Sequence, residues 1–490
     1  MEKELPSPLV LPAIFWGFGI LSGKLVNFYI LIVMFIAFSI FLIYKRFRKI
    51  TILILIFILG GLRVGIPKSE ISISNILKNK DEITQKIILE IDSFPIIKNH
   101  SLKYKAKILE IAGCKAEGKI YLETDNQFLK NGDFIQAIFR VKNLKKYCKK
   151  PSQIKYLQNQ DIEAIAENIT PIVLISHKNN YFKNWVQKLK ETLKYRIKER
   201  FGKNSEFVKA IITGDKGRIR FWKKILQNSG MSHLLAVSGL HVGMISFIFY
   251  IFFKIIFPNR NYARIASIIL LIFYAAICNW SASVTRASIM IIVFYISKIL
   301  ERPINKNQII AIAFLIITII NPKEIFSVGF QMSFTAVIVL INFIPFKFKS
   351  HENKILNILI NFLEIIQTSA ILTLFLSPIT IYNFGQFNLN GIIANIFGIP
   401  FFGIILSTAL LILALPNFQF ILNVYQSAFY SLMFFFKMVV IKLSSMPFKY
   451  EVMNYRKPIF MMGLFLLFGI AILLKKQKNP PKRVFENNSN

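Results

Sequence analysis

Most of the chain alternates between apolar runs and short polar connections. A membrane-spanning helix needs about 20 mostly apolar residues, and the runs at 8–23, 25–44 and 50–66 approach or reach that length. After residue 231 further spans are predicted at about 233–257, 264–279, 285–299, 307–321, 327–346, 355–378, 391–415, 422–446 and 458–474. Pro400 and nearby glycines leave open whether 391–415 crosses fully or folds back. The pattern predicts a polytopic α-helical membrane protein with about twelve transmembrane helices.

Residues 67–180 have more charge, and their short runs alternate apolar with polar positions. These runs lie at 86–92, 104–111, 119–124 and 133–141. Alternation with period two indicates half-buried strands, and Asn131-Gly132-Asp133 is a turn signal between two of them. We expect a small β domain, OB-like in its strand arrangement. Cys114 and Cys148 both fall in it, as a possible disulfide pair or as two unrelated buried thiols.

The next segment, 181–204, has helical spacing with an apolar side and a basic side. Phe182, Trp185, Leu189, Leu193 and Ile197 form the apolar side, and lysines and arginines surround them. Basic amphipathic helices of this kind lie in the membrane interface, and the alternative is a helix that docks a partner. We interpret 181–204 as an amphipathic interfacial helix.

Composition agrees with a membrane protein, and the placement of charge gives its orientation. Of 490 residues 54% are hydrophobic, mean hydropathy is +0.51, and Lys+Arg 61 against Asp+Glu 25 leaves a net charge of +36. The excess indicates an anionic partner, either lipid headgroups or nucleic acid, or a composition bias, since lysine is frequent everywhere. The predicted loops at 45–49, 258–264, 300–307 and 346–354 are basic, whereas 280–284 and 383–390 carry no Lys or Arg. Basic loops stay in the cytoplasm, so the N-terminus is expected inside and the β domain outside.

These features predict five regions. They are N-terminal transmembrane helices at 1–66, an extracytoplasmic OB-like β domain at 67–180, the interfacial helix at 181–204, a transmembrane domain at 205–475 and a basic cytoplasmic tail at 476–490. The expected location is the bacterial cytoplasmic (inner) membrane, crossed many times.

One apolar stretch, 229–245, is unusually rich in polar and small residues. It reads SGMSHLLAVSGLHVGMI and holds two histidines, three serines and three glycines. Buried polar groups in a membrane are costly unless they are paired or face water, while Gly and Ser let helices approach closely. The stretch is therefore either a tight packing surface or the wall of a polar path.

Several blocks of sequence together resemble the ComEC-type competence family. HLLAVSGLHVG at 233–243 resembles the hallmark of that family, and it is the most specific block. The other blocks follow in the family's order: AIITGDKGRI at 210–219, ASVTRASIMI at 282–291, NPKEIFSVGFQMSFTAV at 321–337 and PITIYNFGQFNLNGIIANIFGIPFFG at 378–403. NGDFIQAIFRVKNL followed by KKPSQIKYLQNQDIEAIAE resembles the family's extracytoplasmic domain, without the usual Phe-Asp before Tyr-Leu.

The resemblance implies a function and a set of partners. Members of this family are membrane channels that take single-stranded DNA across the cytoplasmic membrane in natural transformation. The implied partners are the lipid bilayer, single-stranded DNA, a DNA receptor, a separate nuclease and a cytoplasmic ATP-driven translocase, with a homo-oligomer as a further possibility. Many members continue into a metallo-β-lactamase-like nuclease domain. This sequence has 5 histidines and no His-x-His-x-Asp-His run, so we expect no such domain, no cofactor, no metal site and no enzymatic activity.

The candidate DNA-path residues are polar positions within these blocks. His233 and His241 are eight apart, which suits hydrogen bonding or a wet path better than joint metal ligation, and Ser238-Gly239 between them would interrupt the helix. Arg286 would meet phosphate, snorkel to the interface, or pair with a carboxylate such as Asp215 or Glu364. Gln331 and Asn395 would line the path or bond helices together.

Lysines and aromatic residues of the β domain are the second candidate site. Tyr104, Tyr121, Phe134 and Phe139 would stack bases beside the lysines of 103–150, or the lysines form an ordinary solvated face. We interpret the chain as the channel subunit for DNA import. The competing hypotheses are a transporter of another anionic or amphipathic solute and a degenerate relative that no longer transports.

Overall fold

The structure is a computed structural model, and it divides the chain into two compact units. It describes residues 9–22, 48–65, 73–77, 80–93, 96–98, 101–124, 129–147, 154, 157–158, 161–178, 181–215, 217, 219–235, 237–302, 304–343, 354–447 and 449–451. The first unit comprises Met1–Lys223, His233–Gln331 and Gly403–Met433. The second comprises Lys224–Ser232, Met332–Phe402 and Phe434–Asn490.

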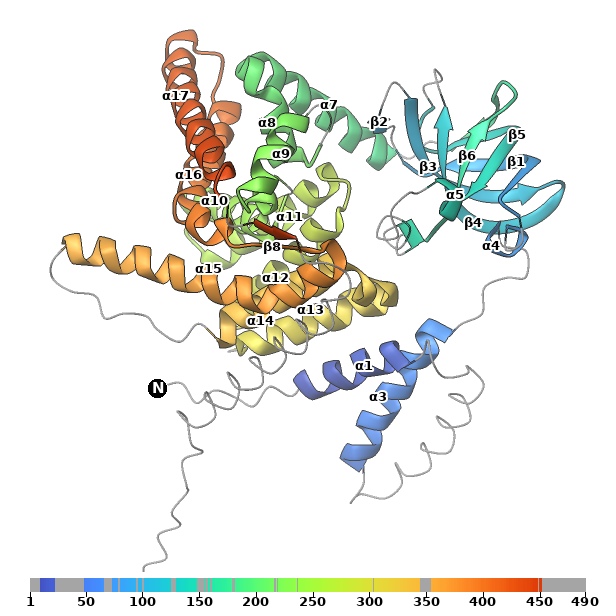
Figure 1. Cartoon of the computed structure of the whole chain (residues 1–490), viewed down its shortest axis with the longest axis horizontal. Helices are drawn as coiled ribbons and strands as arrows, with labels where there is room; N and C mark the ends of the chain where they lie inside the picture. Colours follow the sequence, from blue (N-terminus) through green and yellow to red (C-terminus); the bar gives the residue numbers. More distant parts are fainter. Residues whose placement is uncertain are drawn as a thin grey trace, which may run out of the picture. The chain divides into compact units, whose positions relative to one another are not determined.

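The predicted β domain is present in the first unit as a closed ring of five strands. They are β1 (Glu82–Ile91), β3 (Ser101–Ile111), β4 (Cys114–Thr124), β5 (Asp133–Asn143) and β6 (Ile162–Asn168). β1 pairs with both β3 and β5, β3 pairs with β4, and β6 lies between β4 and β5. The β4–β6 pairing is parallel and the others are antiparallel. Because β1 contacts both β3 and β5, the ring has no open edge along most of its length (Figure 1).

The described part of the domain also contains two short strands and short helical segments. β2 (Ile96–Lys98) pairs with β3, and β7 (Val173–His177) pairs with β5. The helical segments include α4 (Ile73–Ile76) and α5 (Leu144–Tyr147). The four predicted strands are confirmed as β1, β3, β4 and β5, while β6 and β7 were not predicted.

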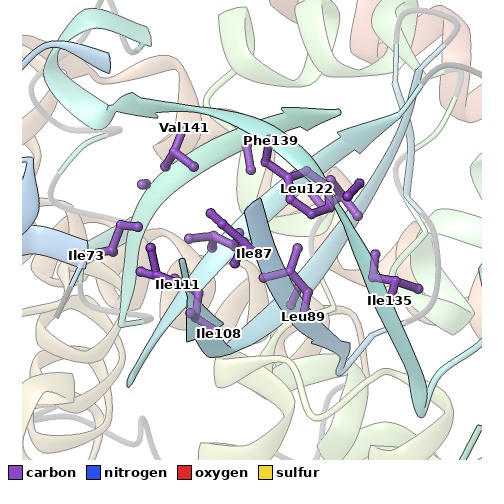
Figure 2. Close-up of a cluster of buried hydrophobic side chains, with 14 of the residues drawn as sticks. Ile73, Ile87, Leu89, Ile108, Ile111, Leu122, Ile135, Phe139 and Val141 are labelled. Carbon is purple, nitrogen blue, oxygen red and sulfur yellow. The ribbon is translucent and has the colours of Figure 1, made fainter. Parts of the chain in front are cut away.

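The apolar residues that alternate with polar ones along the strands fill the interior of the barrel. Along β5 the side chains of Ile135, Phe139 and Val141 are fully buried, with outward positions between them. In Figure 2 these residues converge with Ile87, Leu89, Ile108, Ile111 and Leu122 from the other strands. Burying each such side chain is worth roughly 1.5–3 kcal/mol, so this cluster is the main source of the domain's stability.

Two turns of the domain depend on glycine. The β3–β4 hairpin turns through Ala112 and Gly113, both at positive φ (50° and 89°), as a two-residue hairpin loop requires. The predicted turn at Asn131-Gly132-Asp133 is confirmed, with Gly132 at φ 91°. A Cβ on Gly132 would lie 2.2 Å from the carbonyl oxygen of Lys178, so only glycine fits there.

The helices of the first unit include a run of consecutive neighbours. These are α10 (Gly239–Ile256), α11 (Arg260–Ile277), α12 (Ala282–Ile299) and α13 (Lys306–Ile320), and each contacts the next. Their connections, at 257–259, 278–281 and 300–305, are short, and short connections force neighbouring helices to run antiparallel. At the N-terminal end, α1 (Val10–Ser22) packs on α3 (Arg48–Gly65), where a Cβ on Gly19 would lie 1.8 Å from the carbonyl oxygen of Phe57.

Other helices precede and follow this run. Before α10 lie α7 (Tyr181–Phe201), η2 (Gly202–Asn204), α8 (Ser205–Thr213), α9 (Arg220–Asn228) and η3 (Ser232–Leu234). After α13 come η4 (Pro322–Phe326), α14 (Val328–Asn342), α15 (Lys354–Phe384), β8 (Gln386–Asn388), α16 (Asn390–Ala414), α17 (Gln419–Ser444) and β9 (Lys449–Glu451).

Six helices among the described residues are long and apolar enough to cross a membrane. They are α10, α11, α12, residues Ile360–Phe384 of α15, α16 and α17. The chain is thus a membrane protein. Four shorter apolar helices, Val10–Ser22, Thr51–Arg63, Lys306–Ile320 and Val328–Asn342, fall at other predicted spans. The predicted spans at 25–44 and 458–474 and the tail lie outside the described residues.

Two boundaries differ from the predictions, and the question left open for 391–415 is answered. The span expected from 233 begins at Gly239, because His233 lies in a separate 3-10 turn. The helix expected over 355–378 continues to Phe384, through Pro378. The segment predicted at 391–415 is one continuous helix, Asn390–Ala414, whose 25 residues at 1.5 Å per residue are about 37 Å long and exceed the hydrocarbon core.

Candidate functional site

The polar stretch at 229–245 places a serine and a histidine at the start of α10. Ser238 is the N-cap, with extended backbone, and the helix proper begins at Gly239. The Ser238 N–H donates to Nδ1 of His241 at 3.2 Å, and the Ser238 Oγ lies 2.9 Å from the same nitrogen. A histidine thus takes the place that Glu or Gln has in an ordinary capping box. The predicted interruption of the helix at Ser238-Gly239 is present.

The two histidines have opposite environments. His241 is fully buried, whereas His233 is exposed in η3 together with Ser232. Gly239 and Leu240 are also exposed, and they begin the first turn of α10, where a helix has N–H groups without partners inside the helix. Among the described residues no group of three or more His, Cys, Asp or Glu side chains is arranged to hold a metal ion.

The glycines of this stretch differ in how closely they are packed. A Cβ on Gly239 would lie 3.8 Å from Cβ of Ala287, an ordinary contact, and one on Gly243 would meet nothing within 4 Å. Gly230 is different, since it has φ 78° and a Cβ there would lie 2.5 Å from the backbone nitrogen of Gly391. Tight packing is therefore confined to Gly230, and the two glycines inside the α10 start leave space.

Arg286 lies one residue from Ala287, on the second turn of α12, and it is 5% exposed. Its Nη1 is 3.6 Å from Oε2 of Glu324, and its Nη2 donates to the carbonyl oxygen of Gly329 at 3.1 Å. The Arg286 Nε forms no hydrogen bond to any described residue. The carboxylate partner is thus Glu324, and the prediction of Asp215 or Glu364 in that role is wrong.

Glu324 is held in turn by the beginning of α14. The Ser327 Oγ donates to the Glu324 Oε2 at 3.2 Å and accepts from the Phe330 N–H at 3.2 Å, so it caps α14. Gln331, one residue further on, donates from Nε2 to the carbonyl oxygen of Ile325 at 3.2 Å. Arg286 therefore fastens α12 to the η4–α14 junction, and Gln331 braces the same junction.

Asp215 has a different partner from the one predicted. It forms an ion pair with Lys194 of α7, beside the more deeply buried Lys190. Burial would raise the pKa of Asp215, but the hydrogen bond and charge of Lys194 outweigh it and hold that pKa below its usual value. Burial lowers the pKa of Lys190 to about 8. Asp215, in the block AIITGDKGRI at 210–219, thus joins the loop after α8 to α7.

The second unit holds Asn395 and a junction of asparagines at the start of α16. Asn395 donates from Nδ2 to Oγ of Ser369 at 3.4 Å, joining α16 to α15. Asn390, fully buried, donates to the carbonyl oxygens of Asn228 at 3.1 Å and Met446 at 3.0 Å. Asn388 donates to the same Asn228 carbonyl at 3.1 Å. These amides satisfy the free carbonyls at the end of α9.

Arg200, at the end of α7, is a structural residue that no sequence pattern predicted. It is 4% exposed and its guanidinium donates to the carbonyl oxygens of Ile412 and Leu415 and, at 2.6 Å, to Oδ1 of Asn417. It therefore caps the C-terminus of α16, where a positive charge is favourable.

In the β domain, two of the four aromatic candidates are excluded. Tyr104 and Phe139 are fully buried, and the Tyr104 hydroxyl accepts from the Leu129 N–H at 3.0 Å. Tyr121 and Phe134 are partly exposed. The prediction that all four stack bases is therefore wrong for the two that form the core. Cys114 is exposed and forms no disulfide with the other described cysteine, Cys278, and Cys148 lies outside the described residues, so the Cys114–Cys148 pairing stays a prediction.

Lysines of neighbouring strands share one outward face of the barrel. Lys107 of β3 lies directly opposite Lys119 of β4, and Lys105 lies opposite Tyr121. Lys103 is already neutralised, because it bonds Glu123 and the Tyr147 hydroxyl, the latter at 2.8 Å. Burial, with a smaller contribution from the charge of Lys119, lowers the pKa of Lys105. Facing lysines repel one another, so an anion bound between them would relieve that cost.

Comparison with known proteins identifies the helical part of this arrangement. The family model described as Competence protein matches residues 211–478, which include Arg286, Glu324 and the whole start of α10. The chain belongs to the competence protein family. This competence-family chain is 27% identical over 202 residues to ComE operon protein 3 of Bacillus subtilis (strain 168), covering 40% of the chain and 24% of that relative.

A second relative has a similar extent of match. Recombination protein 2 of Haemophilus influenzae is 24% identical over 205 residues, covering 39% of this chain and 26% of the relative. The aligned part thus spans about a quarter of the length of each curated relative. No solved structure matches the chain.

Proposed function

We propose that this chain is the membrane channel subunit through which single-stranded DNA enters the cytoplasm in natural transformation. The observation that carries the proposal is the family match over 211–478, which covers α10 to α17 and so includes all six of the long apolar helices completely. The names of the two relatives, a ComE operon protein and a recombination protein, agree with a role in the handling of incoming DNA.

The proposed setting is the cytoplasmic membrane, crossed about twelve times, with the β domain outside. Support comes from loop charge. The α10–α11 connection is flanked by Lys254 and Arg260, and the α12–α13 connection contains Arg302, while the α11–α12 connection at 278–281 carries no Arg or Lys. By the positive-inside rule the first two face the cytoplasm. The four shorter apolar helices and the two predicted spans outside the described residues would complete the number of crossings.

We infer that the barrel is OB-like and that it receives the strand. Its order, with β4 parallel to β6 and β5 returning to β1, is that of a five-stranded Greek-key barrel. In OB folds the second and third barrel strands bind oligonucleotides, and these correspond to β3 and β4. Lys105, Lys107, Lys119 and the half-exposed Tyr121 lie on that face, so phosphates would meet the lysines and a base would stack on the tyrosine.

Within the helices, the start of α10 is the proposed wall of the path. Its exposed first turn offers N–H groups and the positive end of the helix dipole to passing phosphates. His233 and Ser238 would add donors, and His241 would hold Ser238 in place. Arg286, buried against Glu324, would hold the neighbouring α12 in position, and Gln331 and Asn395 would supply uncharged hydrogen bonds.

The proposed role is non-enzymatic, and it requires partners. A DNA receptor would deliver the strand, a separate nuclease would remove the other strand, and an ATP-driven translocase in the cytoplasm would supply the work. The chain contains no Gly-x-x-x-x-Gly-Lys-Ser/Thr phosphate loop that would bind ATP itself, because the one partial match, GCKAEGK at 113–119, is followed by Ile120 and runs along β4. A homo-oligomer is a further part of the hypothesis.

The test is uptake of fluorescent DNA by a strain that lacks the protein. Wild type should restore entry of label into the cytoplasm, and His241→Ala and Arg286→Ala should not. Arg260→Ala, an exposed arginine at the start of α11, is the control that should restore uptake. All variants are compared at equal amounts in the membrane.

Normal uptake in the deletion strain would rule out DNA import and favour transport of another anionic or amphipathic solute, or no transport. If only the deletion abolishes uptake and both point variants restore it, the channel stands and these residues are not part of its path.

A further inference from the structure

An exposed apolar patch lies on the β domain, centred on β7. Val173, Leu174 and Ile175 are 60%, 56% and 50% exposed. Ile138 and Ile169 continue the patch, at 38% and 48% exposed, and the Ile169 N–H donates to the Ile138 carbonyl at 2.9 Å. We call these five residues the β7 patch. Apolar residues gathered in this way on a domain surface mark a contact with a membrane or another protein.

The geometry of β7 argues against a partner that adds a strand. Among the described strands β7 pairs with β5 alone, so one of its edges is open. Its register with β5 shifts between Phe134 and Ile135, which leaves Ile175 as an unpaired extra residue. Such a bulge twists an edge strand and interrupts the row of N–H and C=O groups that strand addition needs. All five β7 side chains are exposed, so the apolar surface is not confined to one face.

The segment that follows β7 shows where the patch lies relative to the bilayer. On α7 the buried face carries Val186, Lys190 and Ile197, while Phe182, Trp185 and Leu189 are 51%, 48% and 39% exposed. This helix therefore turns its aromatic side outward, as expected for a helix in contact with lipid.

A contact with α11, one of the membrane-spanning helices, indicates how deep in the membrane the start of α7 lies. The rings of Phe182 and Trp185 lie 6.4 Å and 5.6 Å from the ring of Phe273 in α11. Phe273 is four residues before the end of α11 at Ile277, or about 6 Å at 1.5 Å per residue. The N-terminal turn of α7 thus lies at the level of the membrane interface, where Trp and Tyr concentrate.

Chain length then limits how far the β7 patch can be from that interface. Ile175 and Tyr181 are six residues apart, and an extended chain covers at most about 3.6 Å per residue, or about 22 Å in all. Residues 169–180, ITPIVLISHKNN, contain no acidic side chain, and β7 is followed by Lys178, while Nδ1 of His177 lies 2.6 Å from Oδ1 of Asp133. An apolar strand followed by a basic group suits an anionic bilayer surface.

We propose that the β7 patch inserts into the headgroup boundary of the bilayer, so that the β domain rests on the membrane through this strand. The side chains on both faces of β7 are exposed, and lipid can surround both faces of a strand at once. The patch thereby gives the domain a second membrane attachment in addition to α7.

The test places an environment-sensitive fluorophore on the strand. In a full chain whose Cys114 and Cys148 are replaced by serine, Ile175→Cys is labelled with NBD, and Cys278, which is buried, stays in place. The labelled protein is reconstituted in vesicles that contain phosphatidylglycerol, and lipids carrying a nitroxide near the headgroup act as quenchers. Lys115→Cys, on the exposed start of β4, is the matched control.

We expect emission at position 175 to shift to the blue and to be quenched severalfold more strongly by the nitroxide lipid than emission at 115. Adding Leu174→Asp should reduce that quenching while the label at 115 is unchanged, which shows that the domain is still folded. Equal quenching at both positions overturns the proposal. Shielding of 175 from aqueous iodide without lipid quenching also overturns it, because a protein then covers the strand.

Discussion

Arg286 on α12 and Glu324 in η4 form an ion pair across 38 residues of sequence, with 3.6 Å between Nη1 and Oε2 and both side chains mostly buried. The same guanidinium donates to the Gly329 carbonyl. A buried charge is held in place by its partners, so the ion pair fastens α12 to the start of α14. Arg286 therefore affects the proposed DNA path indirectly, by keeping α12 in position.

Removing either member should therefore have the same effect. Arg286→Ala leaves a buried carboxylate and Glu324→Ala a buried guanidinium, and breaking a buried pair from one side costs about 3–5 kcal/mol. Each variant should lower the thermal midpoint of the protein in detergent by a similar amount. The double variant Arg286→Met with Glu324→Leu should recover most of the loss.

DNA uptake by the same variants separates fastening from direct phosphate contact. If the double variant regains both stability and uptake, Arg286 acts through Glu324. If it regains stability without uptake, the guanidinium itself contacts the strand, and the interpretation of Arg286 as a fastening is refuted.

Gly230 should not tolerate alanine, whereas Gly243 should. At Gly230 the φ of 78° is unfavourable for alanine, and the new Cβ would meet the Gly391 backbone at 2.5 Å. We expect a loss of several kcal/mol or failure to fold. Gly243 lies inside α10 with open space around it, so Gly243→Ala should leave stability equal or raise it by about 0.5–1 kcal/mol. Thermal unfolding of the two purified variants provides the comparison, and equal behaviour would contradict it.

Asn390 should be sensitive even to an isosteric change. Asn390→Asp keeps the shape but replaces the amide that donates to the carbonyls of Asn228 and Met446 with an acceptor. Two hydrogen bonds would be lost and oxygen would face oxygen, at a cost of about 2–4 kcal/mol. Asn423→Asp, exposed on α17, is the matched control and should change the unfolding midpoint little.

Stability should rise above neutral pH because of Lys190. Burial lowers its pKa to about 8 from 10.5, so between these values the folded state holds fewer protons than the unfolded state. The free energy of unfolding therefore rises as pH increases from about 8 to about 10.5, by up to about 3 kcal/mol. Lys190→Met should be more stable than wild type at pH 7 and should lack this rise. Chemical unfolding of wild type and Lys190→Met at a series of pH values measures this difference. If the free energy of unfolding of the two proteins changes with pH in the same way, the prediction is refuted.

The proposed DNA face of the barrel predicts a change in salt dependence. Lys119→Gln removes one charge from the row that faces Lys107. The affinity of the full chain for a single-stranded oligonucleotide should fall, and the slope of log K against log salt should become shallower by about 0.7 per lost phosphate contact. Lys86→Gln, exposed on β1, should change neither. Fluorescence anisotropy at several salt concentrations measures both quantities.

Local patterns in the sequence were enough to predict the strands and several helices. The alternation Lys103, Lys105, Lys107 against Tyr104, Ala106, Ile108 also places Tyr104 on the apolar side of β3, so its burial was predictable. By contrast β6, with its consecutive buried Ala164, Ile165 and Ala166, has no clean alternation, because it has neighbours on both sides and a second small core behind it.

The partners of the candidate site residues were not predictable from spacing. Glu324 lies in a 3-10 turn far from Arg286 in sequence, and Arg200 finds its carbonyls beyond residue 411. No local pattern encodes such contacts. The start of α10 was more accessible to prediction, since Ser238 before Gly239 is an ordinary N-cap signal.

The hydrogen bonds from Arg200 to the end of α16 also have a consequence for biogenesis. Arg200 is synthesised 212 residues before Ile412, which at about 5–20 residues per second is roughly 10–40 s of translation. Until then its guanidinium must remain solvated at the edge of the membrane while the intervening helices insert. The α7 helix can therefore reach its final position only after the ribosome has synthesised α16 and α17. Docking of α7 is thus a late event in assembly.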